Sequence, residues 1–226
     1  MNTTEFNQYK TRYRNAIRQV LSEAEKGRLD EAAFPAYTHR NPFINWLFWQ
    51  RLRKVMDYVQ TPVPYDLILD FGCGSGVMLP YLSGVGKQVT AMDLDLLPLQ
   101  LVENYILFPK SVDVKDGSKT AISDLPSGSY DLIIALDVLE HVKDLPQTLN
   151  DLLNLLKPNG RLIVSGPTEN ILYQIGRKLA GPEYSGDYHE RGIAEIKQEC
   201  GKIATVKPIA TLYWPISLFE LFVVQK

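Results

Sequence analysis

The fold of this chain is decided by the stretch Ile68-Leu69-Asp70-Phe71-Gly72-Cys73-Gly74-Ser75-Gly76. An apolar run that ends in an acid is typical of a buried strand, and the alternating glycines after it predict a loop of bare backbone. Glycine tolerates positive φ and lets a ligand approach the main chain, which a Cβ atom would obstruct. A helix that opens after such a loop points its amides at the same place and favours a carboxylate or phosphate there. The stretch therefore predicts a site for a nucleotide-type cofactor.

The spacing of the glycines separates two kinds of cofactor site. The dinucleotide-binding fingerprint has its third glycine three residues after the second, where this chain has Val77. The spacing here is G-x-G-x-G. Four further segments follow this loop in order. Gln88–Asp93 is a second apolar run that ends in an acid, and Leu125–Leu136 is similar to the pattern LP-x-G-S-F-D followed by a strand. Asp137–Val142 is similar to the pattern VLEHV, and Leu155–Val164 is similar to LLKPGGRL, with Asn159 in place of the first glycine. Together they resemble the motifs of the class I S-adenosylmethionine-dependent methyltransferases.

The resemblance implies S-adenosylmethionine as cofactor and S-adenosylhomocysteine as product. Asp93 is expected to accept hydrogen bonds from both ribose hydroxyls, and Leu94 to cover one face of the adenine. The glycine loop would meet the methionine end, with Asp70 orienting the loop or the cofactor's ammonium group and the backbone of Leu136 beside that group. The implied cofactor-binding residues are Asp70, Gly72, Gly74, Gly76, Asp93, Leu94, Asp116 and Leu136.

The residue at the adenine amino group is the least settled of these assignments. By resemblance it is an acid or amide just past the third strand. Asp116 and Asp113 compete for this place, and the pair Ser123-Asp124 is a third candidate. The alternative for Asp116 is a turn residue in Asp116-Gly117, which we slightly favour because Asp-Gly is a common turn pair.

Two histidines are the candidates for a catalytic base, which the reaction needs only if the acceptor must lose a proton. His141 follows the fourth strand at its carboxyl end, where ligands bind in open α/β sheets. His189 aligns with a histidine found in some small-molecule members of the resembled family. Each histidine is alternatively a structural residue that is hydrogen-bonded near the end of a strand or helix.

Periodicity predicts an α/β fold. Apolar residues at three- and four-residue steps predict helices over 5–26 and 42–60, the second with Asn41 as its cap and Pro42 in its first turn. From Asp66 onward strands and helices alternate, which implies a parallel sheet with helices on both faces. The expected order is strand 66–71, helix 76–83, strand 87–92, helix 96–107, a third strand within 111–124, strand 130–136, helix 145–156 and strand 160–166.

The last third of the chain is less regular. We expect a helix over 167–180, a loop over 181–192, a short helix over 193–199 and a terminal hairpin of strands 203–212 and 217–226 around the turn 213–216. The resemblance implies that the last strand enters the sheet antiparallel. The result is a Rossmann-like, doubly wound, seven-stranded sheet, mostly parallel. Residues 1–60 would form an N-terminal helical cap over the cofactor's methyl group, and residues 61–226 the cofactor-binding domain.

Length and composition fit one soluble domain. The chain has 226 residues, 45% of them hydrophobic, and a net charge of −2, which offers no overall field for nucleic acid. Cys73 and Cys200 cannot build a disulfide framework or a metal cluster, and no acidic cluster marks a metal site, so no metal is expected. Without an apolar signal-peptide core, the expected compartment is the cytoplasm.

The acceptor pocket is expected in the segments outside the core sheet, which are rich in aromatic residues. These are Phe34, Tyr37, Phe43, Trp46, Phe48, Trp49, Tyr173, Tyr184 and Tyr188. The run Trp46–Trp49 beside Arg51, Arg53 and Lys54 is compatible with a membrane surface and a lipid or quinone acceptor, but we favour packing on the sheet. The acceptor, the atom methylated and the oligomeric state stay open.

Two other functions are compatible with the same loop. A nicotinamide-dependent oxidoreductase would use the loop and Asp93, but the glycine spacing and the Leu-Lys-Pro-Asn-Gly turn argue against it. A methyltransferase-like binding module without activity would show a degraded loop, and this loop is intact. We therefore expect a methyltransferase acting on a small-molecule or lipid-like acceptor.

Overall fold

We analysed a computed structural model of the chain, which describes residues 1–23, 37–39, 41–60, 64–168, 191–212 and 217–226. The helix expected over 167–180, nearly all of the loop over 181–192 and the turn over 213–216 lie outside these residues, as do His189, Phe34, Tyr173, Tyr184 and Tyr188.

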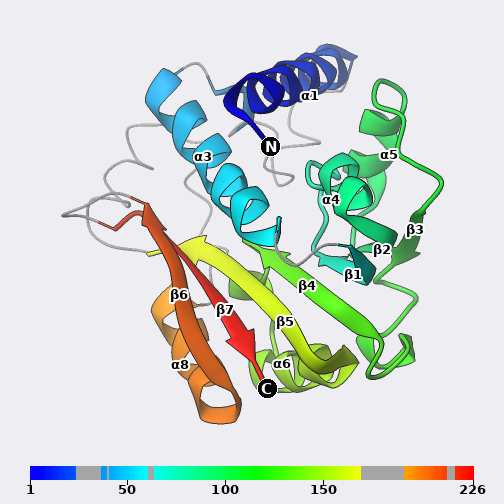
Figure 1. The fold of residues 1–226 in the computed structure, drawn as a ribbon. Helices are drawn as coiled ribbons and strands as arrows, with labels where there is room; N and C mark the ends of the chain where they lie inside the picture. The colour runs from blue at the N-terminus through cyan, green and yellow to red at the C-terminus, as the bar shows by residue number, and fades with distance from the viewer. Residues whose placement is uncertain (24–36, 40, 61–63, 169–190, 213–216) are drawn as a thin grey trace.

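The centre of the molecule is one seven-stranded sheet with the strand order β3-β2-β1-β4-β5-β7-β6 (Figure 1). Neighbouring strands from β3 to β5 pair in parallel, and β7 runs antiparallel to both of its neighbours. The strands are β1 (Tyr65–Phe71), β2 (Gly86–Asp93), β3 (Val112–Asp116), β4 (Tyr130–Leu136), β5 (Leu156–Pro167), β6 (Thr205–Leu212) and β7 (Phe219–Gln225). The predicted Rossmann-like sheet and its antiparallel last strand are confirmed.

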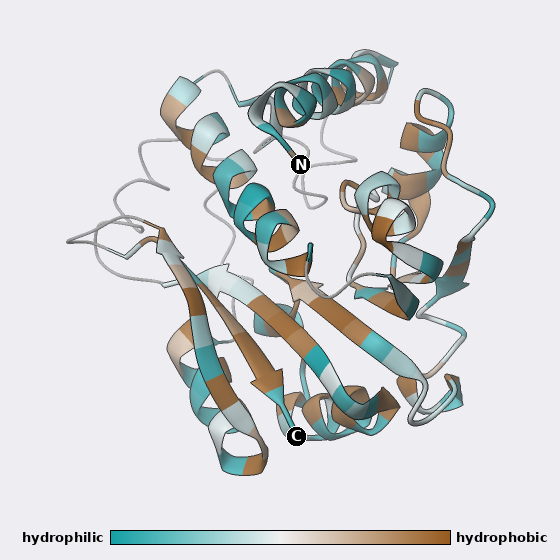
Figure 2. Ribbon diagram, viewed as in Figure 1, coloured by the Kyte–Doolittle hydropathy of each residue, from teal (hydrophilic) through white to brown (hydrophobic). Residues whose placement is uncertain are grey.

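Helices cover both faces of this sheet. They are α1 (Thr3–Glu23), α3 (Pro42–Val59), α4 (Leu79–Val85), α5 (Leu97–Glu103), α6 (Leu145–Leu155) and α8 (Ile193–Ile203), with short 3₁₀ turns η1 (Ile122–Asp124) and η2 (Leu139–His141). Successive side chains of a strand point to opposite faces, so Ile68 joins the core under α1, α3, α4 and α5, whereas Leu69 joins the core under α6 and α8. Figure 2 shows the hydrophobic colouring that runs along the central strands between these layers.

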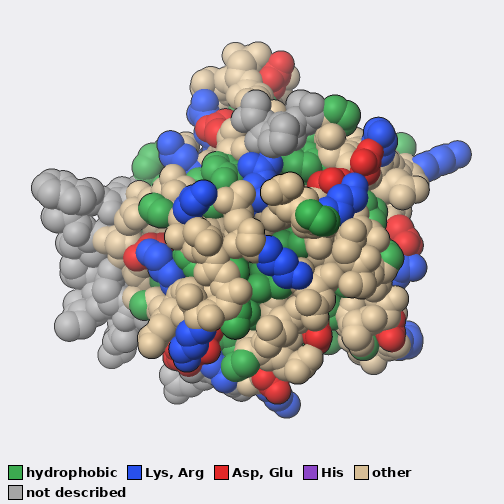
Figure 3. Space-filling view, turned by 60° about the horizontal axis from the view of Figure 1, so that its bottom comes forward, with side chains coloured by type: hydrophobic (Ala, Val, Ile, Leu, Met, Phe, Trp, Pro, Cys, Tyr) green, Lys and Arg blue, Asp and Glu red, His purple; other side chains and the backbone are tan. Residues whose placement is uncertain are grey.

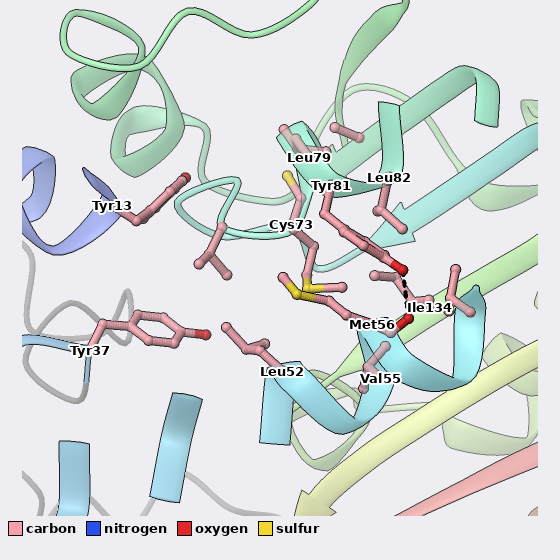
Figure 4. Packing of buried hydrophobic residues seen from close by; sticks show 14 of the residues in the cluster. Tyr13, Tyr37, Leu52, Val55, Met56, Cys73, Leu79, Tyr81, Leu82 and Ile134 are labelled. Carbon is pink, nitrogen blue, oxygen red and sulfur yellow. Dashed lines mark hydrogen bonds between the residues drawn. The ribbon is translucent and has the colours of Figure 1, made fainter. Parts of the chain in front are cut away.

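The N-terminal helices pack on the sheet through a continuous apolar stripe. Asn41 caps α3, because its Oδ1 accepts a hydrogen bond from the backbone N–H of Phe43, as the sequence predicts. Trp49 and Leu52 are fully buried, and Met56 lies beside Cys73 in Figure 4. The Tyr81 hydroxyl of α4 donates to the carbonyl of Met56 at 2.5 Å. The predicted packing of this stripe on the protein core is therefore what the structure has.

Several element boundaries differ from the sequence prediction; strand β5, for example, begins at Leu156 rather than 160. The helix expected over 76–83 begins only at Leu79, because Gly76 has a φ of +75° and the turn hydrogen bonds Gly76 N–Cys73 O and Leu79 N–Gly76 O keep the loop non-helical. Helix α5 ends at Glu103 rather than 107. Helix α8 does not stop before Gly201 but continues to Ile203, because its apolar stripe of Ile193, Ile196 and Cys200 stays buried to the last turn.

The strand order reverses direction at β1. Strand β1 pairs with β2 on one side and with β4 on the other, so the connections leave in opposite directions from this point. In open α/β sheets ligands bind outside the carboxyl ends of the strands at such a reversal. The segments at this edge are the glycine loop after β1, the residues after β2 and the residues after β4.

The surface in Figure 3 carries charges of both signs. On the face that Figure 3 shows, Lys and Arg side chains are interspersed with Asp and Glu. No helix in the described ranges has both the length and the apolar character needed to cross a membrane.

Asp131 ties together the opposite, amino-terminal edge. Its Oδ2 accepts hydrogen bonds from the backbone N–H groups of Asp66 and Leu67 at 2.8 and 3.0 Å, and its Oδ1 binds the Lys157 ammonium at 2.9 Å. One carboxylate thus joins β1, β4 and β5.

Asp131→Ala should lower the free energy of unfolding by about 2 kcal/mol, because it leaves two backbone donors unpaired. Urea titration measures this loss. The matched control is Asp113→Ala, whose exposed carboxylate pairs with Lys115; it should change stability by less than about 0.5 kcal/mol. Equal stability of the two variants would contradict this role of Asp131.

Candidate functional site

The glycine loop between β1 and α4 is held in a conformation that requires its glycines. Gly72, Gly74 and Gly76 have φ values of +75°, +53° and +75°. A Cβ atom on Gly72 would lie 2.4 Å from the Val138 side chain, and one on Gly76 would lie 2.9 Å from Phe108. Gly74 has no atom within 4 Å of that position. The two outer glycines are needed for packing, and the middle one presents open backbone.

Asp93 at the end of β2 holds this loop from the side. Its Oδ2 accepts a hydrogen bond from the Gly74 N–H at 2.7 Å, and its Oδ1 accepts one from the Asp95 N–H at 3.2 Å. Burial raises the pKa of Asp93 above its usual value. Each carboxylate oxygen retains a lone pair, so Asp93 is able to accept further hydrogen bonds from a ligand.

Asp70 at the end of β1 is a buried acid. Its side chain is only 4% exposed, and no hydrogen-bond partner for it occurs among the residues that the structure describes. Burial, together with the nearby charge of Asp93, raises the pKa of Asp70 to about 8. A carboxyl in such a place is stabilised in its charged form by a cation. Asp70 and Asp93 thus place two acids at the carboxyl ends of β1 and β2, where a bound cation would favour the charged form of Asp70.

Two tyrosines of α1 donate hydrogen bonds to carbonyl groups of the glycine loop and of the residue that follows it. The Tyr13 hydroxyl donates to the carbonyl of Ser75 at 2.5 Å, and the Tyr9 hydroxyl donates to the carbonyl of Val77. Figure 4 shows the Tyr13 hydroxyl pointing at the loop. Burial raises the pKa of both tyrosines, and the charge of Asp70 contributes for Tyr9. The sequence analysis missed both residues, because it used them only as apolar positions of a helix.

The residues proposed for the adenine lie around the ends of β2 and β3. Leu94 is 77% exposed and directly follows Asp93. The Asp116 carboxylate accepts hydrogen bonds from the Ser118 N–H and hydroxyl and from the Lys119 ammonium, which lowers its pKa to about 2. Asp113 pairs with Lys115, and Asp124 accepts from the Ala121 N–H. Asp116 thus lies in a turn beside Asp93, as the alternative interpretation has it, and its contact with adenine stays a prediction.

The segment after β4 forms the other wall. Leu136 ends β4, and Asp137 follows it with a φ of +54°. His141 is exposed in η2, where its backbone N–H donates to the carbonyl of Val138. The Glu140 side chain is buried at 2% exposure. A catalytic role for His141 or for His189, which lies outside the described residues, is not tested by this geometry.

A buried ion pair that the sequence did not indicate joins this wall to the N-terminal helices. Arg51 of α3 is only 2% exposed, and its guanidinium pairs with the Asp137 carboxylate. The sequence analysis placed Arg51 in a basic group beside an aromatic run, on the side that was compatible with a membrane. The structure instead buries it, since Arg51 lies over the rings of Phe48 and Phe219.

Comparison with known proteins identifies relatives by sequence. Residues 17–198 match the family described as methyltransferase domain. The ubiquinone biosynthesis O-methyltransferase of Pectobacterium atrosepticum is 28% identical over 148 residues, which cover 65% of this chain and 58% of that protein. The protein of the same name from Rickettsia conorii is 31% identical over 170 residues, covering 72% and 54%. This chain spans a little over half the length of these relatives.

Solved structures share the fold at low sequence identity. The plantazolicin methyltransferase BpumL in complex with S-adenosylhomocysteine superimposes with a TM-score of 0.64 at 16% identity, covering 99% of this chain and 98% of that one. Magnesium protoporphyrin IX methyltransferase from Synechocystis PCC 6803 gives a TM-score of 0.61 at 16% identity, covering 100% and 96%. These likenesses show the Rossmann-like methyltransferase fold.

The raised pKa of Asp70 predicts how stability depends on pH. An unfolded aspartate has a pKa of about 3.9, so the native state binds the proton more tightly, and its stability falls as the pH rises from about 4 to about 8. Asp70→Asn removes this loss. Its melting temperature should exceed that of the parent protein at pH 8.5 and converge with it toward pH 4. Parallel melting curves of the two proteins over this range would refute the buried, unpaired state of Asp70.

Proposed function

Because this chain belongs to the methyltransferase-domain family, we propose that it binds S-adenosylmethionine and transfers a methyl group from it to a small-molecule acceptor. The observation that carries the proposal is the open backbone of Gly74 between two buried or half-buried acids, Asp70 and Asp93. A ligand that combines a cation with ribose hydroxyls matches these groups. The family match favours this function over the nicotinamide-dependent alternative.

The residues present fit the cofactor group by group. We assign the ribose hydroxyls to Asp93, whose two oxygens retain free lone pairs, and the methionine end to the open backbone at Gly74. The Asp70 carboxyl lies at the same edge and suits the ammonium group, which would restore its charged form. Leu94 is exposed beside Asp93 and offers an apolar surface to the adenine.

The cofactor, when bound, supplies a methyl group that its sulfonium already activates, so little chemical help is needed from the protein. The protein's own work is to orient the acceptor and to exclude water. Tyr9 and Tyr13 serve this end, because they hold the loop carbonyls from above and join α1 to the loop. A hydroxyl acceptor loses its proton when it is methylated, and a base must take that proton; His141 and His189 stay the candidates proposed from the sequence.

For the acceptor we propose an aromatic hydroxyl, free or carried on a lipid-like molecule. The support is the name of the relatives, which are ubiquinone biosynthesis O-methyltransferases. The cytoplasm as the site of action is likewise a proposal, supported by two buried cysteines, Cys73 and Cys200, that form no disulfide.

Asp93→Ala should weaken the binding of S-adenosylhomocysteine by about 1–3 kcal/mol, the scale of hydrogen bonds to a charged group. Calorimetric titration measures this loss, with NADH as the control ligand. The matched control variant is Asp66→Ala, an exposed carboxylate at the opposite edge of the sheet; it should bind with parental affinity. Unchanged affinity of Asp93→Ala would refute the assigned role, and binding of NADH alone would refute the proposed function.

A further inference from the structure

Asp137, the residue after β4, has a positive backbone φ angle, which is uncommon for a residue other than glycine. Only two residues other than glycine have positive φ in the described part of the chain, Asp137 at +54° and Asn159 at +67°. Asn159 lies in the first part of β5, at the amino-terminal edge of the sheet, where the pairing of β5 with β4 is irregular. Asp137 lies at the opposite, carboxyl-terminal edge. Uncommon conformations of this kind persist at sites where the fold must aim one side chain.

The Asp137 carboxylate is held by groups from two layers of the protein. Its Oδ1 accepts a hydrogen bond from the Ser165 hydroxyl of β5 at 3.0 Å, and Arg51 pairs with its Oδ2. Arg51 is in turn fixed between the rings of Phe48 and Phe219, at 5.2 and 5.3 Å from their centroids. Its Nη2 also donates to the Tyr37 hydroxyl at 3.3 Å.

This arrangement leaves hydrogen-bonding capacity on one side of Asp137. A carboxylate has about four lone-pair sites, and these two contacts use two of them. The Asp137 side chain is 22% exposed, whereas Arg51 is 2% exposed. The next residue, Val138, fills the space where a Cβ on Gly72 would stand, so Asp137 lies directly beside the glycine loop. A fixed and accessible negative charge therefore stands at the edge where the acceptor must meet the cofactor.

We propose that Asp137 binds the acceptor by accepting a hydrogen bond from its hydroxyl group, and that Arg51 is a positioning residue that holds the Asp137 carboxylate in place. The inference rests on the proposed function and deepens it. It selects an acceptor that donates a hydrogen bond, such as a phenol or catechol, over one without a donor. It also gives the N-terminal helices a part in acceptor binding, since Arg51 and Tyr37 come from them.

The test uses Asp137→Asn, which keeps the size of the side chain and suits positive φ but removes the charge. The probe is 3,4-dihydroxybenzoate, a soluble catechol. In the variant, its KM in methyl transfer and its Kd for the protein saturated with S-adenosylhomocysteine should rise at least tenfold. The Kd of S-adenosylhomocysteine itself should change less than twofold. Asn159→Asp, the reverse exchange at the other positive-φ residue, should leave all three constants unchanged.

The double variant Arg51→Met with Asp137→Asn separates loss of acceptor binding from loss of folding. It removes both charges of the ion pair, so that no buried charge is left without a partner. It should show the same loss of probe binding with intact S-adenosylhomocysteine binding. Parental probe affinity in either Asp137 variant would overturn the inference and leave the proposed function standing. Parallel loss of both affinities in both variants would overturn it in favour of a purely structural role. A parent protein that binds S-adenosylhomocysteine but does not bind or methylate the catechol would overturn it too, whereas absent S-adenosylhomocysteine binding would refute the proposed function.

Discussion

The site depends on one electrostatic constraint, which is that two acids flank a loop of bare backbone at the carboxyl ends of β1 and β2. Asp93 is compensated by the Gly74 N–H, but the buried Asp70 has no hydrogen-bond partner in the described part of the chain. Burying a charged carboxylate without a partner destabilises the folded state. Burial and the nearby charge of Asp93 therefore raise the pKa of Asp70 to about 8, so that the carboxyl is mostly protonated at neutral pH. A bound cation would favour the charged form of Asp70, which is why the proposed function assigns the ammonium group of the cofactor to this carboxyl.

The N-terminal helices complete the site rather than merely covering it. Helix α1 contributes two tyrosine hydroxyls to the carbonyls of the glycine loop, and α3 contributes Arg51 to Asp137 after β4. Each tyrosine is more than sixty residues away in the sequence from the loop carbonyl to which it donates. The glycine loop and the segment after β4 are thus each contacted by a different helix of the same N-terminal region.

Local signals in the sequence predicted the elements of the fold, and long-range contacts explain what they missed. The alternating glycines, the acid after each strand and the apolar periods are local, so the alternation of strands and helices and the Asn41 cap follow from them. The burial of Arg51 was not predicted, because the residue belongs to a run of basic residues and only the tertiary structure shows that it turns inward. The start of α4 was wrong because positive φ at Gly76 overrides helix propensity. Asp116 shows where prediction of site residues from the sequence ends, because the pair Asp116-Gly117 is equally compatible with a turn and with a residue that contacts a ligand.

The most direct test of this account is the number of protons released when S-adenosylhomocysteine binds at pH 7. Calorimetry in buffers of different ionisation enthalpy gives this number. At this pH a carboxyl with a pKa of about 8 is mostly protonated, and an ammonium group bound beside it favours the charged form. The account predicts release of close to one proton by the parent protein and none by Asp70→Asn. Binding without proton release in the parent protein would contradict the central role of Asp70.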